Sequence, residues 1–193
     1  VNGTNPLVKL LIERGEKFDC CIVGEPSSYE VFGDMIKIGR RGSLTGRLTL
    51  YGKQGHSAYP HRADNPIPRL LSTLTEINAD RLDEGTRNFQ PSHLEVTTID
   101  VDNPAANVIP AKAHATFNVR FNETYSGETL AERLAHICRR CAGKHDLRFE
   151  YGAEPFITSP GPLTDTAIAA LRKVAGCVPE LSTTGGTSDA RFI

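Results

Sequence analysis

The chain has 193 residues, of which 39% are hydrophobic and 23% are charged, and its formal net charge is -1. This composition is typical of a soluble globular protein and excludes a fibrous or disordered chain. Because no run of like charges occurs, we expect no nucleic-acid partner and no membrane surface as a partner, and the charge pattern favours small or peptidic ligands.

The first predicted elements are a short helix and a buried strand. The helix covers 5–15, with Asn5 as the expected N-cap, Pro6 at the first helical position and Gly15 as the stop. The apolar run at 20–26 ends in an acidic residue, Glu25, and predicts a buried parallel strand. A helix followed by such a strand is typical of an α/β fold.

From Gly42 onward the pattern changes to strict alternation of apolar and polar residues. The segments 46–52 and 112–122 alternate most regularly and predict half-exposed antiparallel strands, with further strands expected at 93–101 and 147–152.

Two amphipathic helices are predicted among these strands. The first begins behind Asn65 and Pro66, and the second is capped by Ser126 and ended by Gly143. Their apolar stripes have helical spacing: Ile67, Leu70, Leu71, Leu74 and Ile77 in the first, and Leu130, Leu134, Ile137, Cys138 and Cys141 in the second. A single sheet with both helices on one face would bury these stripes.

The proline- and glycine-rich stretch at 154–163 predicts a hinge, followed by a helix opened by Thr164 or Asp165 and closed by Gly176. The predicted plan is an inserted α+β two-layer sandwich at 42–153. It would be flanked by two pieces of an α/β domain, at 1–41 and 154–193.

The five cysteines show no even spacing, so we expect reduced thiols. Cys138 and Cys141 have the spacing of half a zinc site, but they lie on the apolar stripe of a predicted helix and no second pair is near. We interpret them as core thiols.

No apolar run approaches the roughly 20 residues of a membrane span, and no signal peptide is visible, which predicts a cytoplasmic protein. The chain starts at Val1 without Met and stops within an apolar step at Ile193, so we expect a piece of a longer protein.

Two of the candidate sites have an ordinary alternative. Glu25 lies where open α/β sheets gather ligands, beyond the carboxyl end of a strand, although a Glu before Pro is often a solvated loop acid. In "GRRGS" at 39–43, Arg40 and Ser43 are suited to clamping a carboxylate, but a solvated basic turn is equally compatible with the composition.

A third candidate is the segment "GGTSDAR" at 185–191, whose backbone amides and hydroxyls could surround an anionic oxygen. It lacks the spacing and the lysine of a P-loop, so nucleotide binding is not predicted.

The fourth candidate is a glycine-flanked loop that contains His56 and His61. Their spacing differs from that of a helical metal pair, and His56 could donate a hydrogen bond to a developing oxyanion. We expect His56 to be the catalytic member and His61 the supporting one. The remaining histidines are expected at the surface.

Taken together, five segments resemble the succinyl-diaminopimelate desuccinylases, a branch of the M20 family of zinc amidohydrolases: "IVGEPSS", "IKIGRRGSL", "GKQGHSAYPH", "NPAANVIPAKAHATFNVRFN" and "GGTSDARFI". The resemblance covers nearly the whole chain. It implies an α/β catalytic domain interrupted by a two-layer lid that also forms a homodimer.

The resemblance also implies roles for individual residues. Glu25 would bind one of two zinc ions, with cobalt as an alternative metal, and His56 would reach across the dimer to stabilise the tetrahedral intermediate. The dicarboxylate substrate would be held by residues of both subunits: Arg40, Ser43, Gly186 and Thr187 from one, and Asn107 and Arg120 from the other.

The family's other metal ligands and its general base have no counterpart in this sequence, so we expect the chain to be inactive by itself. Two rival functions remain open. One is another M20 amidohydrolase, such as an acetylornithine deacetylase or an aminoacylase, and the other is a non-catalytic dimerisation module.

Overall fold

A computed structural model describes residues 3–186 and 188–193. The chain divides into two compact units, each of which is described by itself. The first unit comprises Val1–Arg41, Arg87–Phe89 and Pro155–Ile193, and the second comprises Gly42–Thr86 and Gln90–Glu154.

The second unit is built on a four-stranded antiparallel sheet with the order β5-β7-β3-β8. Its strands are β3 (Gly42–Tyr51), β5 (His93–Asp100), β7 (Lys112–Phe121) and β8 (His145–Ala153). All four strands expected from alternation are thereby confirmed.

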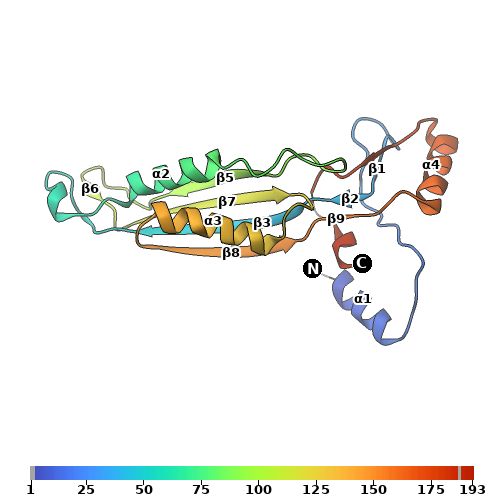
Figure 1. Cartoon of the computed structure of the whole chain (residues 1–193), viewed down its shortest axis with the longest axis horizontal. Helices are drawn as coiled ribbons and strands as arrows, with labels where there is room; N and C mark the ends of the chain where they lie inside the picture. The colour runs from blue at the N-terminus through green and yellow to red at the C-terminus, as the bar shows by residue number, and fades with distance from the viewer. Residues whose placement is uncertain (1–2, 187) are drawn as a thin grey trace. The chain divides into compact units, whose positions relative to one another are not determined.

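Helices α2 (Pro66–Ala79) and α3 (Gly127–Cys141) cover one face of this sheet (Figure 1). The Asn65 side chain accepts a hydrogen bond from the backbone N–H of Ile67, which caps α2. Ser126 and Thr129 form a reciprocal capping box at the start of α3. Both predicted helices and both predicted caps are confirmed.

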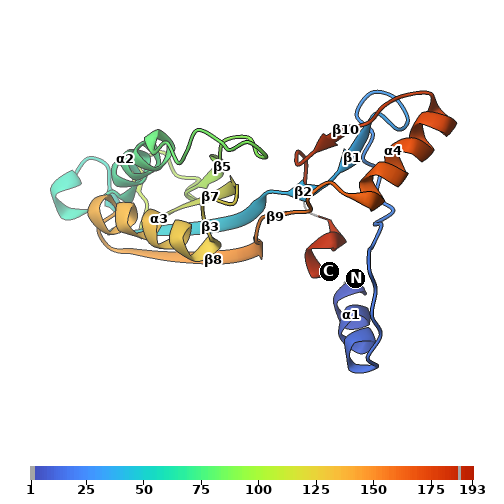
Figure 2. The same cartoon turned by 45° about the vertical axis from the view of Figure 1, so that its right-hand side comes forward.

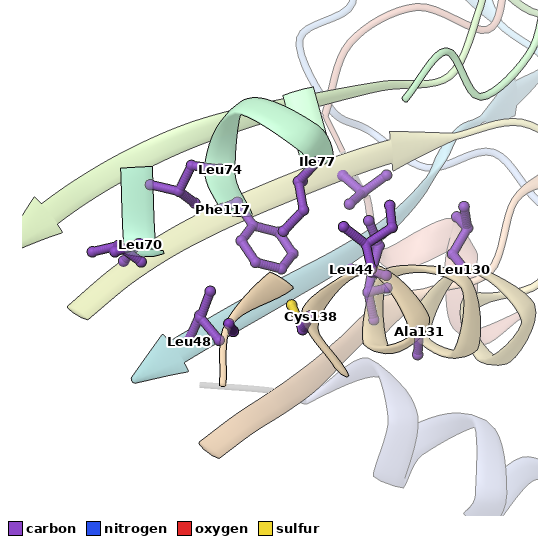
Figure 3. Close-up of a cluster of buried hydrophobic side chains, with 14 of the residues drawn as sticks. Leu44, Leu48, Leu70, Leu74, Ile77, Phe117, Leu130, Ala131 and Cys138 are labelled. Carbon is purple, nitrogen blue, oxygen red and sulfur yellow. The ribbon is translucent and has the colours of Figure 1, made fainter. Parts of the chain in front are cut away.

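The core of the second unit lies between the helices and the sheet, where the apolar stripes interlock (Figure 3). Leu44 and Leu48 of β3, Phe117 of β7 and Leu130 of α3 are at most 1% exposed. Each buried side chain of this size contributes about 1.5–3 kcal/mol, so the alternation of β3 and β7 fixes which face receives the helices.

The five cysteines of the chain are free. Cys138 is fully buried in the core, which confirms its interpretation as a core thiol, and burial raises the pKa of this thiol to about 11. Cys141 is partly buried against the same core.

A small arm of the second unit extends the chain beyond β3. Strand β4 (Gly55–His56) pairs antiparallel with β6 (Val108–Ile109), and the short helix η1 (Pro60–Arg62) follows β4. In Figure 1, β6 lies at the end of the sheet where β3 finishes.

The first unit contains short strands and two longer helices. Strand β1 (Met35–Lys37) pairs in parallel with β10 (Glu180–Ser182), beside which it is drawn in Figure 2. Strand β2 (Gly39–Arg40) pairs antiparallel with β9 (Phe156–Ile157). The helices are α1 (Thr4–Glu13), α4 (Pro162–Ala175) and the short η2 (Asp189–Phe192).

The predicted strand at 20–26 is wrong. The segment is irregular, its two cysteines are exposed, and Ile22 is 74% exposed. A strand persists only when a neighbour pairs with its backbone, and no described strand lies beside this segment. The parallel pairing of this unit is made instead by β1 and β10.

Two predicted helix starts also need correction. Helix α1 begins at Thr4 behind Gly3 rather than behind Asn5, and α4 begins at Pro162 behind Gly161. In α4 the fixed φ of proline suits the first helical position, so Pro162 starts the helix two residues before Thr164. Every helix among the described residues is too short or too polar to cross a bilayer.

Candidate functional site

His56 and Asn107 lie together on the arm of the second unit. His56 is exposed at the end of β4, and Asn107 directly precedes β6, the partner of β4. The Nδ2 atom of Asn107 is 3.5 Å from Nε2 of His56, and the Ser57 backbone N–H donates to the Asn107 carbonyl at 2.9 Å. The β4–β6 pairing therefore presents an imidazole and an amide side by side.

The imidazole of His56 is held in one tautomer by the backbone. The N–H of Ala58 donates to Nδ1 of His56 at 3.0 Å, so Nδ1 is an acceptor and the ring proton belongs on Nε2. The Asn107 amide nitrogen is also a donor, so its 3.5 Å approach to Nε2 is not a hydrogen bond in this tautomer. A neutral imidazole with an exposed Nε2–H can donate a hydrogen bond to an oxygen that gains negative charge. It is a poor proton acceptor at Nε2.

His61 has a different environment in η1. Its ring packs edge-on against Tyr59, with centroids 6.3 Å apart, and the Tyr59 ring is tilted against His56 at 6.0 Å. The guanidinium of Arg62 lies 5.4 Å from the centre of the same Tyr59 ring. Tyr59 is thus the common contact of the two histidines.

Ser43 and Arg120 form a second pair at the opposite end of the sheet. They are direct cross-strand partners on β3 and β7, and both are half-buried on the face that the helices leave open. A Cβ on Gly152 would lie 3.1 Å from Cβ of Ser43, so glycine leaves room for the serine side chain. A hydroxyl beside a guanidinium suits a carboxylate.

These two pairs are far apart within one chain. Ser43 and Tyr51 stand near the two ends of β3, eight positions apart, which corresponds to about 26 Å at the rise of an extended strand. His56 follows Tyr51 on the arm. Arg120 lies near the end of β7, eight positions after Lys112 at its start, and Asn107 precedes that start.

The strand pairing does not bring Asn107 and Arg120 together within one chain. The cross-strand register puts Arg120 beside Ser43, whereas the β4–β6 pairing puts Asn107 beside His56. The roles of Asn107 and Arg120 in ligand binding stay predictions.

In the first unit, Arg40 faces the segment 184–186. Its side chain is buried, at 9% exposure, and Nη1 donates to the carbonyl of Thr184 at 3.2 Å. Gly185 has a φ of +96°, and a Cβ there would lie 2.9 Å from Nη1 of Arg40, so both the conformation and the contact require glycine. Gly186 follows in the same exposed turn. Thr187 lies outside the described residues.

A residue that the sequence analysis missed, Lys37, contacts the same segment. Its Nζ donates to Oγ1 of Thr184 at 2.7 Å and lies 3.4 Å from Oγ of Ser182. Lys37 is a single cation within an apolar segment, and this pattern could have predicted that its side chain contacts other parts of the chain. Only Ile38 separates β1 from β2, and the side chains of Lys37 and Arg40 both reach Thr184.

Glu25 is exposed, and its Oε1 accepts the backbone N–H of Asp189 at 3.2 Å. The Asp189 carboxylate in turn accepts the hydroxyl of Thr4 at 2.5 Å. Among residues 3–186 and 188–193, no three acidic, histidine or cysteine side chains converge in a way that could hold a metal ion. A stable site needs three or four ligands, so Glu25 does not form one with the described residues.

The family profile described as "Peptidase dimerisation domain" (M20_dimer) matches residues 38–146. A succinyl-diaminopimelate desuccinylase of Parvibaculum lavamentivorans is 52% identical over the whole chain, and one of Rhodopseudomonas palustris is 53% identical. The chain spans 50% and 51% of these relatives, about half their length.

Solved structures show the same fold at low identity. An M20 family metallo-carboxypeptidase from Sulfolobus solfataricus has a TM-score of 0.66 at 15% identity, covering 80% of this chain and 48% of that one. An aminopeptidase PepT from Bacillus cereus has a TM-score of 0.65 at 17% identity, covering 82% of this chain and 42% of that one.

Proposed function

Because the chain belongs to the M20 peptidase dimerisation family, we propose that it supplies the dimerising and substrate-binding part of a succinyl-diaminopimelate desuccinylase. The whole enzyme would hydrolyse N-succinyl-diaminopimelate to succinate and diaminopimelate. The observation that carries the proposal is that the imidazole donor His56 lies far from the Ser43–Arg120 pair within the second unit, on a chain 52% identical to a relative of that name.

The substrate carboxylates are assigned to the basic and hydroxyl groups. Arg120 and Ser43 hold one carboxylate, since a guanidinium and a hydroxyl at neighbouring register positions can bind its two oxygens together. Arg40, with the backbone of Gly186, holds another. Thr187 is retained from the sequence resemblance alone.

His56 acts at the active site of the other subunit in this proposal. The roughly 26 Å length of β3 prevents His56 from reaching a ligand held by Ser43 in its own chain, so a second subunit has to bring the imidazole. Asn107 accompanies His56 because β4 and β6 carry them together. The proposal therefore requires a homodimer through the second unit.

The chemical role of His56 is hydrogen-bond donation. Its Nε2–H donates to the amide oxygen as water attacks the carbonyl carbon and negative charge builds up on that oxygen. The Ala58 N–H keeps the proton on Nε2 throughout, so His56 is assigned neither the general base nor the general acid.

The two zinc ions implied by the sequence resemblance are not assigned to this chain, because Glu25 is the only predicted ligand and does not complete a site. Glu25 stays a predicted ligand whose companions lie elsewhere. The cytoplasmic location, and the expectation of neither nucleic acid nor membrane as a partner, also stay predictions.

One observation favours a second candidate, a non-catalytic dimerisation module. The matching family profile is that of a dimerisation domain. The same chain would then contribute only association and ligand binding.

The test is a chimaera in which this chain replaces the aligned residues of the Parvibaculum lavamentivorans relative. We expect kcat/KM for N-succinyl-diaminopimelate to exceed that for N-acetylornithine by about a hundredfold or more, because a neutral acetyl group leaves the carboxylate contacts unpaired. A preference for the acetyl substrate would identify another M20 amidohydrolase. A folded, metal-loaded dimer that hydrolyses neither would support the dimerisation module.

A further inference from the structure

Lys37 lies at the end of β1 with its ammonium group turned toward the chain itself. The Nζ atom lies 2.7 Å from Oγ1 of Thr184, 3.4 Å from Oγ of Ser182 and 2.6 Å from Sδ of Met35. An ammonium has three N–H donors, and these three acceptors use them. Lys37 is therefore not free to bind a ligand directly.

The two cations at this place, Lys37 and Arg40, have no carboxylate of the described residues in ion-pair contact, although Glu180 and Asp34 act on Lys37 at longer range. Both cations converge on Thr184, one through its hydroxyl and the other through its carbonyl. Burial first, and then the positive charge of Arg40, lower the pKa of Lys37. Two neighbouring cations that repel each other suit a place where an anion binds.

The hydroxyl groups can be assigned by counting lone pairs. Oγ of Ser182 accepts from the Thr184 backbone N–H at 3.2 Å and from Lys37, so both of its lone pairs are used. Its own hydrogen then goes to Oγ1 of Thr184, 2.8 Å away. Oγ1 of Thr184 now accepts from Lys37 and Ser182, and only its own hydrogen is left to donate.

We propose that Thr184 donates its hydroxyl hydrogen to a carboxylate of the ligand, and that Lys37 is the positioning residue that makes Thr184 a donor only. The inference deepens the proposed function and rests on its assignment of a carboxylate to Arg40. Arg40 fixes the backbone of Thr184, Lys37 fixes its side chain, and the positive φ of Gly185 turns the chain directly afterwards. The site excludes a donor group, which would find no acceptor on Thr184, and the positive charges of Lys37 and Arg40 favour a carboxylate over a neutral carbonyl.

Succinate titrated into this chain, followed by the NMR signals of the Gly185 and Gly186 amides, tests the inference without turnover. We expect Lys37→Met and Thr184→Val each to lower the affinity for succinate about tenfold. Thr184→Val removes a hydrogen bond to the carboxylate, and Lys37→Met removes the group that orients Thr184. Thr184→Ser keeps the hydroxyl and should stay within about twofold of the wild type. Neutral succinamide should bind more weakly to the wild type and lose less affinity in these variants than succinate does, because its bond to Thr184 is not charge-assisted.

The double variant Lys37→Met, Thr184→Val decides whether Lys37 acts through Thr184. We expect it to bind succinate no more weakly than Thr184→Val alone, whereas fully additive losses would mean that Lys37 contacts the ligand itself and would overturn the positioning role. Lys173→Met removes a charge from the exposed face of α4 and should change nothing.

Two further outcomes are decisive. If Thr184→Val binds succinate as tightly as the wild type does, the inference is overturned. This result decides the matter even if Lys37→Met fails to fold. An inactive chimaera combined with the expected succinate pattern would reject the desuccinylase and leave the anion site standing, so the two failures are distinguishable.

Discussion

At the scale of single residues, the backbone contact of His56 determines what this side chain can do. The Ala58 N–H donates to Nδ1, so the neutral ring carries its proton on Nε2. His56 is therefore expected to act as a hydrogen-bond donor through Nε2–H and not as a general base. NMR shifts of the two ring nitrogens should show the Nε2–H tautomer in the neutral form.

In the chimaera, His56→Ala should lower kcat by about a hundredfold while KM and metal content stay nearly unchanged. A donor to the developing oxyanion acts mainly in the transition state, and removing one such donor costs about 2.7–4 kcal/mol. His61→Ala is the matched control, because its ring contacts Tyr59 in the same loop and should leave kcat within a few-fold. A His56→Ala variant that raises KM and leaves kcat intact would assign His56 to ground-state binding.

Glu25 leads to a prediction about the metal. The isolated chain should bind zinc weakly, because one exposed carboxylate with no described companion cannot satisfy a four-coordinate ion. Calorimetric titration of the chain and of Glu25→Gln should give the same weak heats. Tight stoichiometric binding that Glu25→Gln abolishes would show that the chain carries a complete site.

At the scale of elements, a polar cluster around Asp83 joins the segment after α2 to the end of β7. Oδ1 of Asp83 accepts from the backbone N–H groups of Gly85 at 2.7 Å and Ser92 at 3.1 Å, and from Nδ2 of Asn122 at 2.8 Å. Burial alone would raise the pKa of Asp83, but hydrogen bonds from Ser92, Gly85 and Asn122 outweigh it, so the pKa is lowered.

This cluster should make stability depend on acid pH. Since the folded pKa of Asp83 lies below its unfolded value of about 3.9, its contribution is complete above that value and is lost as the pH falls through the folded pKa. Asp83→Asn should lower the free energy of unfolding at neutral pH by about 1–3 kcal/mol and flatten its decline below pH 4 or so. Urea unfolding at several pH values measures both, with exposed Asp102→Asn as control. A parallel decline in both proteins would show that Asp83 is not the titrating group.

The elements that local pattern could predict are those whose partners lie in the same unit. The alternation of β3 and β7 and the caps at Asn65 and Ser126 specify a sheet with two helices, because every apolar stripe has a described face to cover. The apolar segment around Ile22 has no such partner among the described strands, so the same physical signal gave a wrong strand. Whether an apolar segment becomes a strand therefore depends on the presence of a pairing partner, which local sequence does not reveal.

The candidate site was less predictable than the fold. Residue types alone identified Arg40 and Ser43, but the separation of Asn107 from Arg120 follows only from strand register. Lys37 was missed because its contacts with Ser182 and Thr184 join positions about 145 residues apart in the sequence. Without the β1–β10 pairing, no pattern near Lys37 predicts that contact.

At the scale of the whole molecule, the opposite placement of His56 and Arg120 leads to a test that mixes two variants of the dimeric chimaera. If Arg120 serves its own subunit and His56 the other, a heterodimer of His56→Ala with Arg120→Ala has one site with both residues intact and one with neither. Random mixing makes half of the dimers mixed, so about a quarter of the wild-type activity should return although each parent is nearly inactive.

Two other assignments predict no recovery. If both residues serve their own subunit, or if both serve the other subunit, each site of the mixed dimer lacks one of them. Mixing His56→Ala with His56→Ala, Asn107→Ala is the control, because these two changes lie on the same arm and every site then loses its imidazole. Recovery in the first mixture and none in the control would show that Arg120 and His56 of one chain serve two different active sites. No recovery in heterodimers verified by mass spectrometry would place His56 and Arg120 at the same site from the same subunit, against the separation that the sheet imposes on them.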